Sequence, residues 1–211
     1  MFKNLIYDLD AIRERDPAAR GRLEIFLLYS GFHAVLYHRI AHFFYKRGMK
    51  FIARMISQNA RFLTGVEIHP GAQIGRGLLI DHGAGVVIGE TAIVGDNCTI
   101  YQGVTLGGTG KDVGKRHPTI GNNVMIGSGA KVLGPFTVGD NVKIAAGAVV
   151  LNEIPENSTA VGVPARVISR GKTASKDSLD QVHIPDPVSQ ELCRMRAEIE
   201  ALEKKIENLS K

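Results

Sequence analysis

Aliphatic residues return at every sixth position through the middle of the chain. They form three runs: Ile68, Ile74, Ile80, Val86; then Ile88, Val94, Ile100, Leu106; then Ile120, Ile126, Val132, Val138, Ile144, Val150. A six-residue period is typical of a parallel β-helix, in which each short strand stacks on the strand one coil away. The pattern therefore predicts such a coil over 65–170, interrupted once by two extra residues and once by a loop at 107–119.

Helical spacing replaces this period before the coil. Over residues 1–64 apolar positions recur three and four apart, which predicts an N-terminal helical domain. Asp16 followed by Pro17 predicts an N-cap with proline at the first helical position. The stretch 32–55 is basic and amphipathic, and fits either a membrane-surface helix or a helix packed on its neighbours. The packed helix is the favoured interpretation, and no membrane association is expected.

A second helical pattern follows a polar linker at 171–189. Within 190–211, apolar residues take the a and d positions of a heptad: Leu192, Met195, Ile199, Leu202, Ile206 and Leu209. A helix of so few heptads is only marginally stable by itself. This amphipathic coiled-coil helix is therefore expected to dock on another chain or on the protein body. Glu198 and Glu203, at g and e, would face each other in a parallel dimer, which favours another arrangement.

Composition narrows the class of ligand and the compartment. The net charge is +5, but the basic residues are spread over both terminal segments and one loop with few aromatics among them. This disfavours nucleic acid and favours a phosphorylated small molecule. Cys98 and Cys193 suggest no disulfide framework, and the N-terminus lacks the pattern of a signal peptide. We therefore expect a cytoplasmic protein.

Candidate chemistry lies where residues break the repeat. Glu67 and His82 are fifteen residues apart, and a coil of three hexads takes eighteen, so the two are expected on neighbouring turns. A carboxylate that reaches one imidazole nitrogen leaves the other as a general base. By residue type alone, Glu67, His82 and the adjacent Asp81 also fit ordinary exposed residues with no functional role. The loop GGTGKDVGKRHP carries four basic side chains but fails the P-loop pattern, so a solvated loop is the plain alternative.

A metal site is not expected. Within the coil region the histidines are His69, His82 and His117, and the last lies in a basic loop that would repel a cation.

Three segments together carry a more specific resemblance. The chain closely resembles the serine O-acetyltransferase family of hexapeptide-repeat acyltransferases in VEIHPGAQIGRGLLIDHGAGVVIGET, in VTLGGTGKDVGKRHPTIGNNVMIGSGAKVLG and in STAVGVPARV. The similarity extends back through RERDPAARGRLEIFLLYSGFHAVLYHRIAHFFYKRG. The repeat alone indicates only the superfamily, whereas IDHG, GGTGK and KRHP in combination indicate this family.

The resemblance implies a fold and a reaction. The fold class is α+β: an N-terminal α-helical domain, a left-handed parallel β-helix and a C-terminal helix. The reaction moves acetyl from acetyl-CoA to the L-serine hydroxyl, giving O-acetyl-L-serine and CoA, as the first step of cysteine biosynthesis. By resemblance His82 is the general base and Glu67, where the family more often has Asp, orients it.

Binding residues are also carried over by resemblance. Asp16 and Asp81 would receive the ammonium of serine, while Arg116 and His117 would bind its carboxylate. The co-substrate acetyl-CoA would lie along the coil beside Gly107, Gly108, Ser128, Gly129, Ala146 and Gly147, with Lys143 and Arg166 near its phosphates.

Assembly and regulation follow from the same resemblance. It implies a homotrimer with active sites between coils, so that His82 and the His117 loop come from different subunits; a hexamer remains open. L-cysteine is expected to inhibit by occupying the serine site. Because the tail is a heptad helix ending in Lys211, a complex with O-acetylserine sulfhydrylase is not expected. The alternatives are an acetyltransferase for a sugar or other hydroxyl acceptor, and a scaffold protein that binds a partner through its terminal helix.

Overall fold

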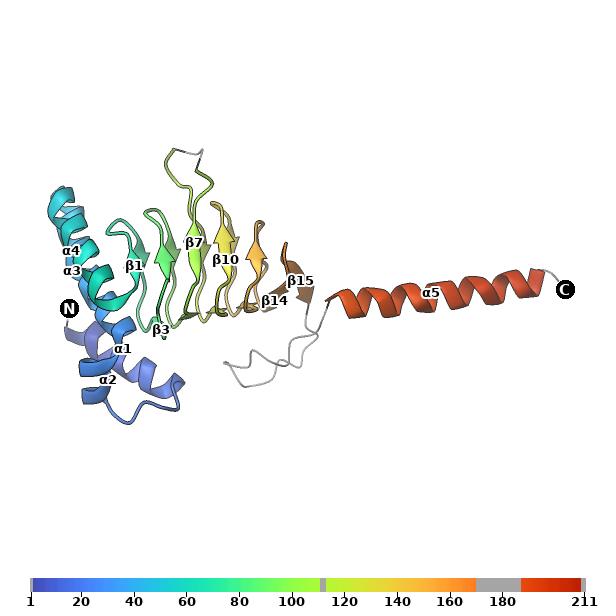
Figure 1. Cartoon of the computed structure of the whole chain (residues 1–211), viewed down its shortest axis with the longest axis horizontal. Helices are drawn as coiled ribbons and strands as arrows, with labels where there is room; N and C mark the ends of the chain where they lie inside the picture. Colours follow the sequence, from blue (N-terminus) through green and yellow to red (C-terminus); the bar gives the residue numbers. More distant parts are fainter. Residues whose placement is uncertain (1, 111–112, 170–186, 210–211) are drawn as a thin grey trace. The chain divides into compact units, whose positions relative to one another are not determined.

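A computed structural model describes residues 2–110, 113–169 and 187–209. The chain divides into two compact units, Met1–Gln181 and Val182–Lys211, and each is described by itself. In the first unit, four helices precede a coil of short stacked strands (Figure 1). The predicted fold class, helices followed by a parallel β-helix and a C-terminal helix, is confirmed.

The helical part begins with α1 (Phe2–Arg15) and α2 (Arg22–Leu28), followed by α3 (Ser30–Lys46) and α4 (Lys50–Thr64). The predicted N-cap at Asp16 is wrong, because α1 ends at Arg15 and α2 does not begin until Arg22. Asp16 instead closes a turn, in which its Oδ1 accepts a hydrogen bond of 2.8 Å from the Ala18 amide. The amphipathic stretch 32–55 forms two helices, α3 and α4, that pack together. No helix among the described residues is long and apolar enough to cross a membrane.

Three parallel sheets form the walls of the coil. The strands are β1 (Glu67–Ile68), β2 (Gln73–Ile74), β3 (Leu79–Asp81), β4 (Val87–Ile88), β5 (Ile93–Val94), β6 (Thr99–Tyr101), β7 (Thr105–Gly107), β8 (Thr119–Ile120), β9 (Met125–Ile126), β10 (Lys131–Leu133), β11 (Thr137–Val138), β12 (Lys143–Ile144), β13 (Val149–Val150), β14 (Ser158–Val161) and β15 (Arg166–Ser169). Their order is β1-β4-β7-β10-β13 in the first sheet, β11-β8-β5-β2 in the second and β15-β14-β12-β9-β6-β3 in the third. Among the strands of the described residues, only β15 runs antiparallel, against β14.

The six-residue anchors fill the interior of the coil. In the first sheet Ile68 pairs with Ile88, and Ile88 with Leu106. In the third sheet Ile80 pairs with Ile100 in the same way. Every anchor is buried except Ile74, which is half-buried. Each strand places one aliphatic side chain inside the coil, where it stacks on the equivalent side chain of the next coil. This requirement explains the six-residue period in the sequence.

One corner of the first coil is longer than its equivalents. Ile80 and Ile88 are eight residues apart, whereas Ile100 and Leu106, around the same corner one coil later, are six apart. The two extra residues that interrupt the repeat therefore lie between β3 and β4, in the segment that contains His82. The backbone of His82 is left-handed, with φ of 59°. Among the described residues, the other non-glycines with positive φ are all asparagines, a residue that tolerates this conformation.

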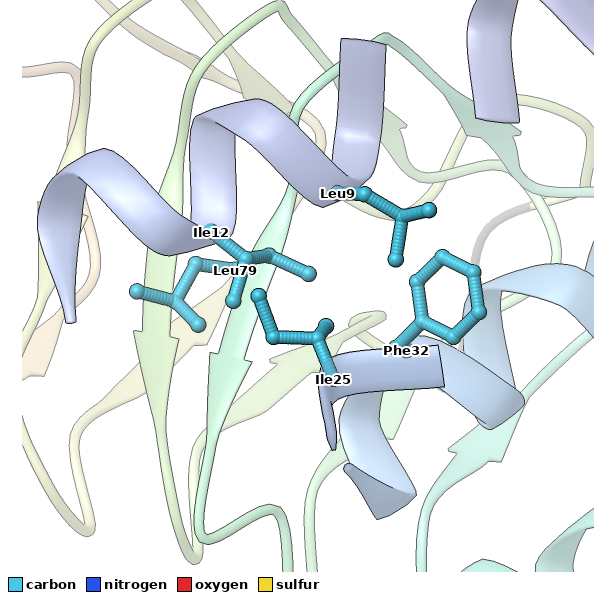
Figure 2. Close-up of a cluster of buried hydrophobic side chains, with 5 residues drawn as sticks. All are labelled: Leu9, Ile12, Ile25, Phe32 and Leu79. Atoms are coloured by element: carbon cyan, nitrogen blue, oxygen red, sulfur yellow. The ribbon is translucent and has the colours of Figure 1, made fainter. Parts of the chain in front are cut away.

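A small apolar core joins the helices to the coil. Figure 2 shows side chains from α1, α2, α3 and β3 pointing toward one another; they are Leu9, Ile12, Ile25, Phe32 and Leu79. Leu79 is 2 % exposed although it lies on the outer face of the coil, because the helices cover it. This contact fixes the helical part against β3, the strand that leads into Asp81 and His82.

The second unit is described as one helix, α5 (Pro187–Leu209). It begins three residues before the predicted start at 190. The predicted linker at 171–189 lies outside the described residues up to 186, and its last three residues belong to α5.

Candidate active site

A pocket of about 400 Å³ opens where the helical part meets β3. Its lining comes from the α1–α2 connection, the end of α2, the start of α3, the end of β3 and the turn after it: Asp16, Ala18, Leu28, Tyr29, Ser30, Gly31, Ile80, Asp81 and His82. Three residues singled out from the sequence, Asp16, Asp81 and His82, therefore line one cavity although Asp16 is far from the other two in the chain.

Tyr29 holds Asp16 in this pocket. The Tyr29 hydroxyl donates a hydrogen bond of 2.7 Å to Asp16 Oδ2, while Oδ1 accepts from the Ala18 amide. Burial raises the pKa of Tyr29, and its hydrogen bond to Asp16 and the nearby Asp81 carboxylate raise it further. The phenol therefore stays protonated and acts as a donor to Asp16.

The turn after β3 presents His82 to solvent. Asp81 ends the strand, and the Gly83 amide donates back to the Asp81 carbonyl at 2.7 Å. This tight turn puts the His82 backbone in the left-handed region and leaves its side chain 76 % exposed, with Nε2 3.9 Å from Asp81 Oδ1. A non-glycine residue in this region costs free energy, and such strain gathers at functional sites. The start of α3 supports the turn from behind, because a Cβ on Gly31 would lie 2.1 Å from the Ile80 carbonyl oxygen.

Glu67 lies beside this turn on β1. Its neighbour Val66 touches the turn, since a Cβ on Gly83 would lie 2.8 Å from Val66 Cγ2. The Glu67 carboxylate itself pairs with α4, with Oε2 3.4 Å from Arg61 Nε. Both Glu67 and His82 are described, and no hydrogen bond joins them in this single chain. The role of Glu67 in orienting His82 therefore stays a prediction.

Arg116 belongs to a separate group of side chains, at the corner between the first and second sheets. Its Nη2 lies 2.6 Å from Glu90 Oε2, and the Tyr45 hydroxyl donates a hydrogen bond of 2.9 Å to Glu90 Oε1. Hydrogen bonds from Tyr45 and Arg116 hold the pKa of Glu90 below its usual range. Glu90 thus ties the basic loop to α3, the helix that carries Tyr45.

His117 is buried beside Arg116 in a defined tautomer. Thr91 Oγ1 accepts hydrogen bonds from the Arg116 and His117 amides, so its own hydroxyl hydrogen is free to point at His117 Nδ1, 2.9 Å away. Because Nδ1 is then the acceptor, the neutral ring carries its proton on Nε2. Burial, and then the Arg116 guanidinium, lower the pKa of His117, which favours this neutral form. A Cβ on Gly89 would lie 2.0 Å from His117 Nε2, so only glycine leaves room for the ring.

The two groups occupy different corners of one chain. His82 lies between β3 and β4, whereas Glu90 and Thr91, which hold Arg116 and His117, lie between β4 and β5. One chain therefore does not bring the carboxylates of Asp16 and Asp81 and the nitrogen donors of Arg116 and His117 into a single pocket around a zwitterionic substrate.

The residues expected to contact acetyl-CoA also divide between corners. Ser128 and Gly129 lie between β9 and β10, and Ala146 and Gly147 between β12 and β13, on the same corner as His82 two and three coils away. There the backbone forms a ladder, in which the Gly129 amide donates to Gln102 and the Gly147 amide to Ser128, each at 2.8 Å.

The other expected co-substrate residues lie elsewhere. Gly107 ends β7, and Gly108 packs against Arg116 and His117 at the next corner. Lys143 and Arg166 lie in the third sheet, on β12 and β15.

Several residues that build the site were missed in the sequence. Tyr29, Glu90 and Thr91 hold Asp16, Arg116 and His117 in place. Glu90 and Thr91 could have been found, because they end the conspicuous segment IDHGAGVVIGET. No group of three or more His, Cys, Asp or Glu side chains suited to a metal ion occurs among the described residues.

Known proteins give an independent view of this chain. Residues 1–36 match the family model described as serine acetyltransferase, N-terminal, and residues 117–152 match bacterial transferase hexapeptide (six repeats). A serine acetyltransferase of Bacillus pumilus (strain SAFR-032) is 54% identical over 211 residues, which cover 100% of this chain and 97% of the relative. The chain belongs to the serine acetyltransferase family.

Solved structures of the family share the fold. The serine acetyltransferase of Neisseria gonorrhoeae in complex with serine matches with a TM-score of 0.77 and 46% identity, over 80% of this chain and 69% of that one. A serine acetyltransferase in complex with cysteine matches with a TM-score of 0.82 and 43% identity, over 86% and 71%. The chain is therefore an acyltransferase that acetylates serine, the step that leads toward cysteine.

Proposed function

We propose that the acetyl group is transferred at the pocket of Asp16, Asp81 and His82, with His82 as the general base. The observation that carries this proposal is the convergence of these three residues on one cavity. His82 takes the proton from the serine hydroxyl as the oxygen attacks the thioester carbonyl of acetyl-CoA. The tetrahedral intermediate then collapses, the C–S bond breaks, and the imidazolium returns the proton to the CoA thiolate.

Serine would be held by both groups of side chains. Asp16 and Asp81 accept hydrogen bonds from its ammonium, while the Arg116 guanidinium and the Nε2–H of His117 donate to its carboxylate. Because these groups lie at different corners, the proposal includes a homotrimer in which the His82 corner of one chain faces the Arg116 corner of the next. Glu90 then positions Arg116 from outside the pocket.

Acetyl-CoA would follow the corner that carries His82. Gly129 and Gly147 have φ of 70° and 69°, and a Cβ on either would meet nothing within 4 Å, so their outer face is open to a ligand. Lys143 and Arg166 would supply positive charge for its phosphates. L-cysteine, which has a thiol where serine has a hydroxyl, would compete for the same pocket; the relative solved with cysteine supports this.

The role of His82 is tested with two variants. His82→Asn removes the base but keeps a residue that tolerates the left-handed backbone, whereas His82→Ala tests the deletion alone. Release of free thiol from acetyl-CoA is measured with L-serine, L-homoserine and a galactoside offered in parallel. Turnover with serine should fall by about 10²-fold or more in both variants. Asn123→Ala, at another left-handed position (φ 55°), is the matched control and should keep its turnover.

Two outcomes would overturn the assignment separately. Wild-type turnover in His82→Asn would remove His82 from the mechanism. Thiol release with the galactoside but not with serine would instead favour a sugar acceptor, whatever the role of His82.

The role of Glu67 must be tested with a measurement that does not change when the ion pair between Glu67 and Arg61 is lost. If Glu67 orients His82 and stabilises its imidazolium, Glu67→Gln should lower kcat about tenfold or more and shift the acidic limb of the kcat/KM profile to lower pH, and Glu67→Asp should restore part of the rate. Arg61→Gln, which breaks only the ion pair, is the control. Equal profiles for Glu67→Gln and Arg61→Gln would show that Glu67 serves the ion pair alone.

A further inference from the structure

The helix α5 exposes a continuous apolar stripe. Its described members are each more than half exposed: Leu192, Met195, Ile199, Leu202 and Ile206. They occupy successive a and d positions, so they lie on one face along the helix. A stripe of this length left in water is unfavourable, and short isolated helices are marginal. A helix of another chain, packed on this stripe, would therefore stabilise α5 and shield the stripe from water.

The stripe is suited to pairing with a second copy of itself. Its residues are all apolar, with Leu192, Ile199 and Ile206 at a positions and Met195 and Leu202 at d positions. A second copy of α5 offers the same stripe, which makes the surface self-complementary as a two-fold contact requires.

Charges beside the stripe select the direction of pairing. In a parallel pair each g position faces the following e position of the other helix, which opposes Glu198 to Glu203. In an antiparallel pair centred on the stripe, e faces e and g faces g. Arg196 then meets Glu203, and Glu198 meets Lys205, each pair occurring twice by symmetry. We propose that α5 forms an antiparallel coiled coil with α5 of a second copy of this chain.

Contacts within α5 show which ion pair between the two helices determines their antiparallel direction. Glu198 already has a partner on its own helix, with Oε1 3.3 Å from Arg194 Nε. Arg196 and Glu203 have no ion pair within the described part of the helix, and both are exposed. The contact between Arg196 and Glu203 of the two copies is therefore the one that depends most on antiparallel pairing.

Antiparallel pairing has a consequence for assembly. The two chains enter the pair from opposite ends, and the proposal takes them to belong to two separate catalytic assemblies. If those assemblies are trimers, several tails act together, and a contact too weak alone becomes strong through effective concentration.

The first test compares assembly masses of the full-length chain. By light scattering or sedimentation, the wild type should have twice the mass of Ile199→Asp, in which a charge interrupts the stripe. Ala197→Asp, at an outward f position of the same helix, is the matched control and should keep the wild-type mass. Equal masses for wild type and Ile199→Asp would overturn the proposal and leave the stripe to the protein's own body or another partner.

The second test uses a substitution whose sign differs between directions. Glu203→Lys replaces the attraction with Arg196 by repulsion in an antiparallel pair, but removes the Glu198–Glu203 repulsion in a parallel one. At low salt the larger assembly should dissociate at about fivefold or more higher concentration in Glu203→Lys. Adding Arg196→Glu should restore it. Tighter association of Glu203→Lys would overturn the antiparallel direction.

The third test measures the geometry directly. Cys193 is exposed on α5, whereas Cys98 is buried and burial raises the pKa of its thiol to about 11, so a thiol spin label should attach at Cys193. Antiparallel helices centred on the stripe separate two Cys193 residues by roughly 20 Å along the axis, while parallel helices place them at the same height. A shortest spin–spin distance under about 15 Å in the larger assembly would contradict the proposal.

Discussion

Arg15 is the residue through which α1 is most firmly hydrogen-bonded to the coil. Its Nη1 donates to the carbonyls of Asn97 and Cys98 and to the Thr99 hydroxyl, each at 2.9 Å, and its Nη2 donates to the Gly77 carbonyl. Burial lowers its pKa, but a guanidinium remains charged at any pH of interest. The next residue along the chain, Asp16, lines the candidate active-site pocket.

Arg15→Met should destabilise the protein and loosen that pocket. A hydrogen bond from a charged group contributes about 1.5–3 kcal/mol, and four acceptors on the coil lose such a donor. The Cys98 carbonyl keeps its bond from the Leu79 amide, and methionine retains part of the apolar contact, so the net loss should be about 3 kcal/mol. For a chain of this size this lowers Tm by about 6–12 °C. The KM for serine should rise more than kcat falls, because Asp16 is displaced while His82 is not.

The assay pairs thermal unfolding with steady-state kinetics. Arg13→Met, at an exposed position of the same helix, is the control and should change Tm by less than about 2 °C. Arg15→Lys keeps the positive charge but not the several N–H donors of the guanidinium, so its Tm should lie between those of the wild type and Arg15→Met. A Tm for Arg15→Met within about 2 °C of the wild type would show that these hydrogen bonds contribute little.

Three further perturbations follow from the structure. Glu90→Gln removes the ion pair that positions Arg116, so the KM for serine should rise about tenfold with kcat changed less than threefold; an unchanged KM would separate Arg116 from substrate binding. Gly31→Ala puts a methyl group against the Ile80 carbonyl, and should cost about 2 kcal/mol of unfolding free energy and most of the turnover, as urea unfolding and thiol release would show. Burial lowers the pKa of His38 to about 3 from an ordinary 6.5. Between pH 6.5 and 3 only the unfolded chain takes up a proton at His38. The free energy of unfolding is therefore at its full value above pH 6.5 and falls as the pH is lowered toward 3; at pH 5 the loss is about 2 kcal/mol. His38→Phe should flatten this dependence in urea unfolding between pH 7 and 5, and an unchanged slope would assign it to other groups.

The coil was predictable because its determinant is local. Each strand contributes one inward aliphatic such as Ile100 or Ile126, both fully buried, and the repeat records that requirement directly. His82 and Glu67 also stood out, because titratable residues beside anchors are conspicuous in a regular repeat.

The contacts that support the site were not predictable, even where the residues themselves stood out, because these contacts join distant segments. Tyr29 reaches Asp16 from another helix, and Tyr45 reaches Glu90 across 45 residues of sequence. No local pattern marks such pairs. The error at Asp16 has a related cause: Asp-Pro serves helix starts and turns alike, and the packing of α1 and α2 decides between them.

The strand register also bears on how the chain folds. Most strand pairings join residues about one coil apart, such as Ile88 with Leu106, so each coil can form on its neighbour with little loss of chain entropy. The pocket instead needs α1 and α3 to dock on β3, and the bonds from Arg15 to Asn97 and Cys98 span more than 80 residues. During refolding, β structure should therefore return before turnover does, and the delay between them includes the docking of the helices as well as the proposed association of the subunits.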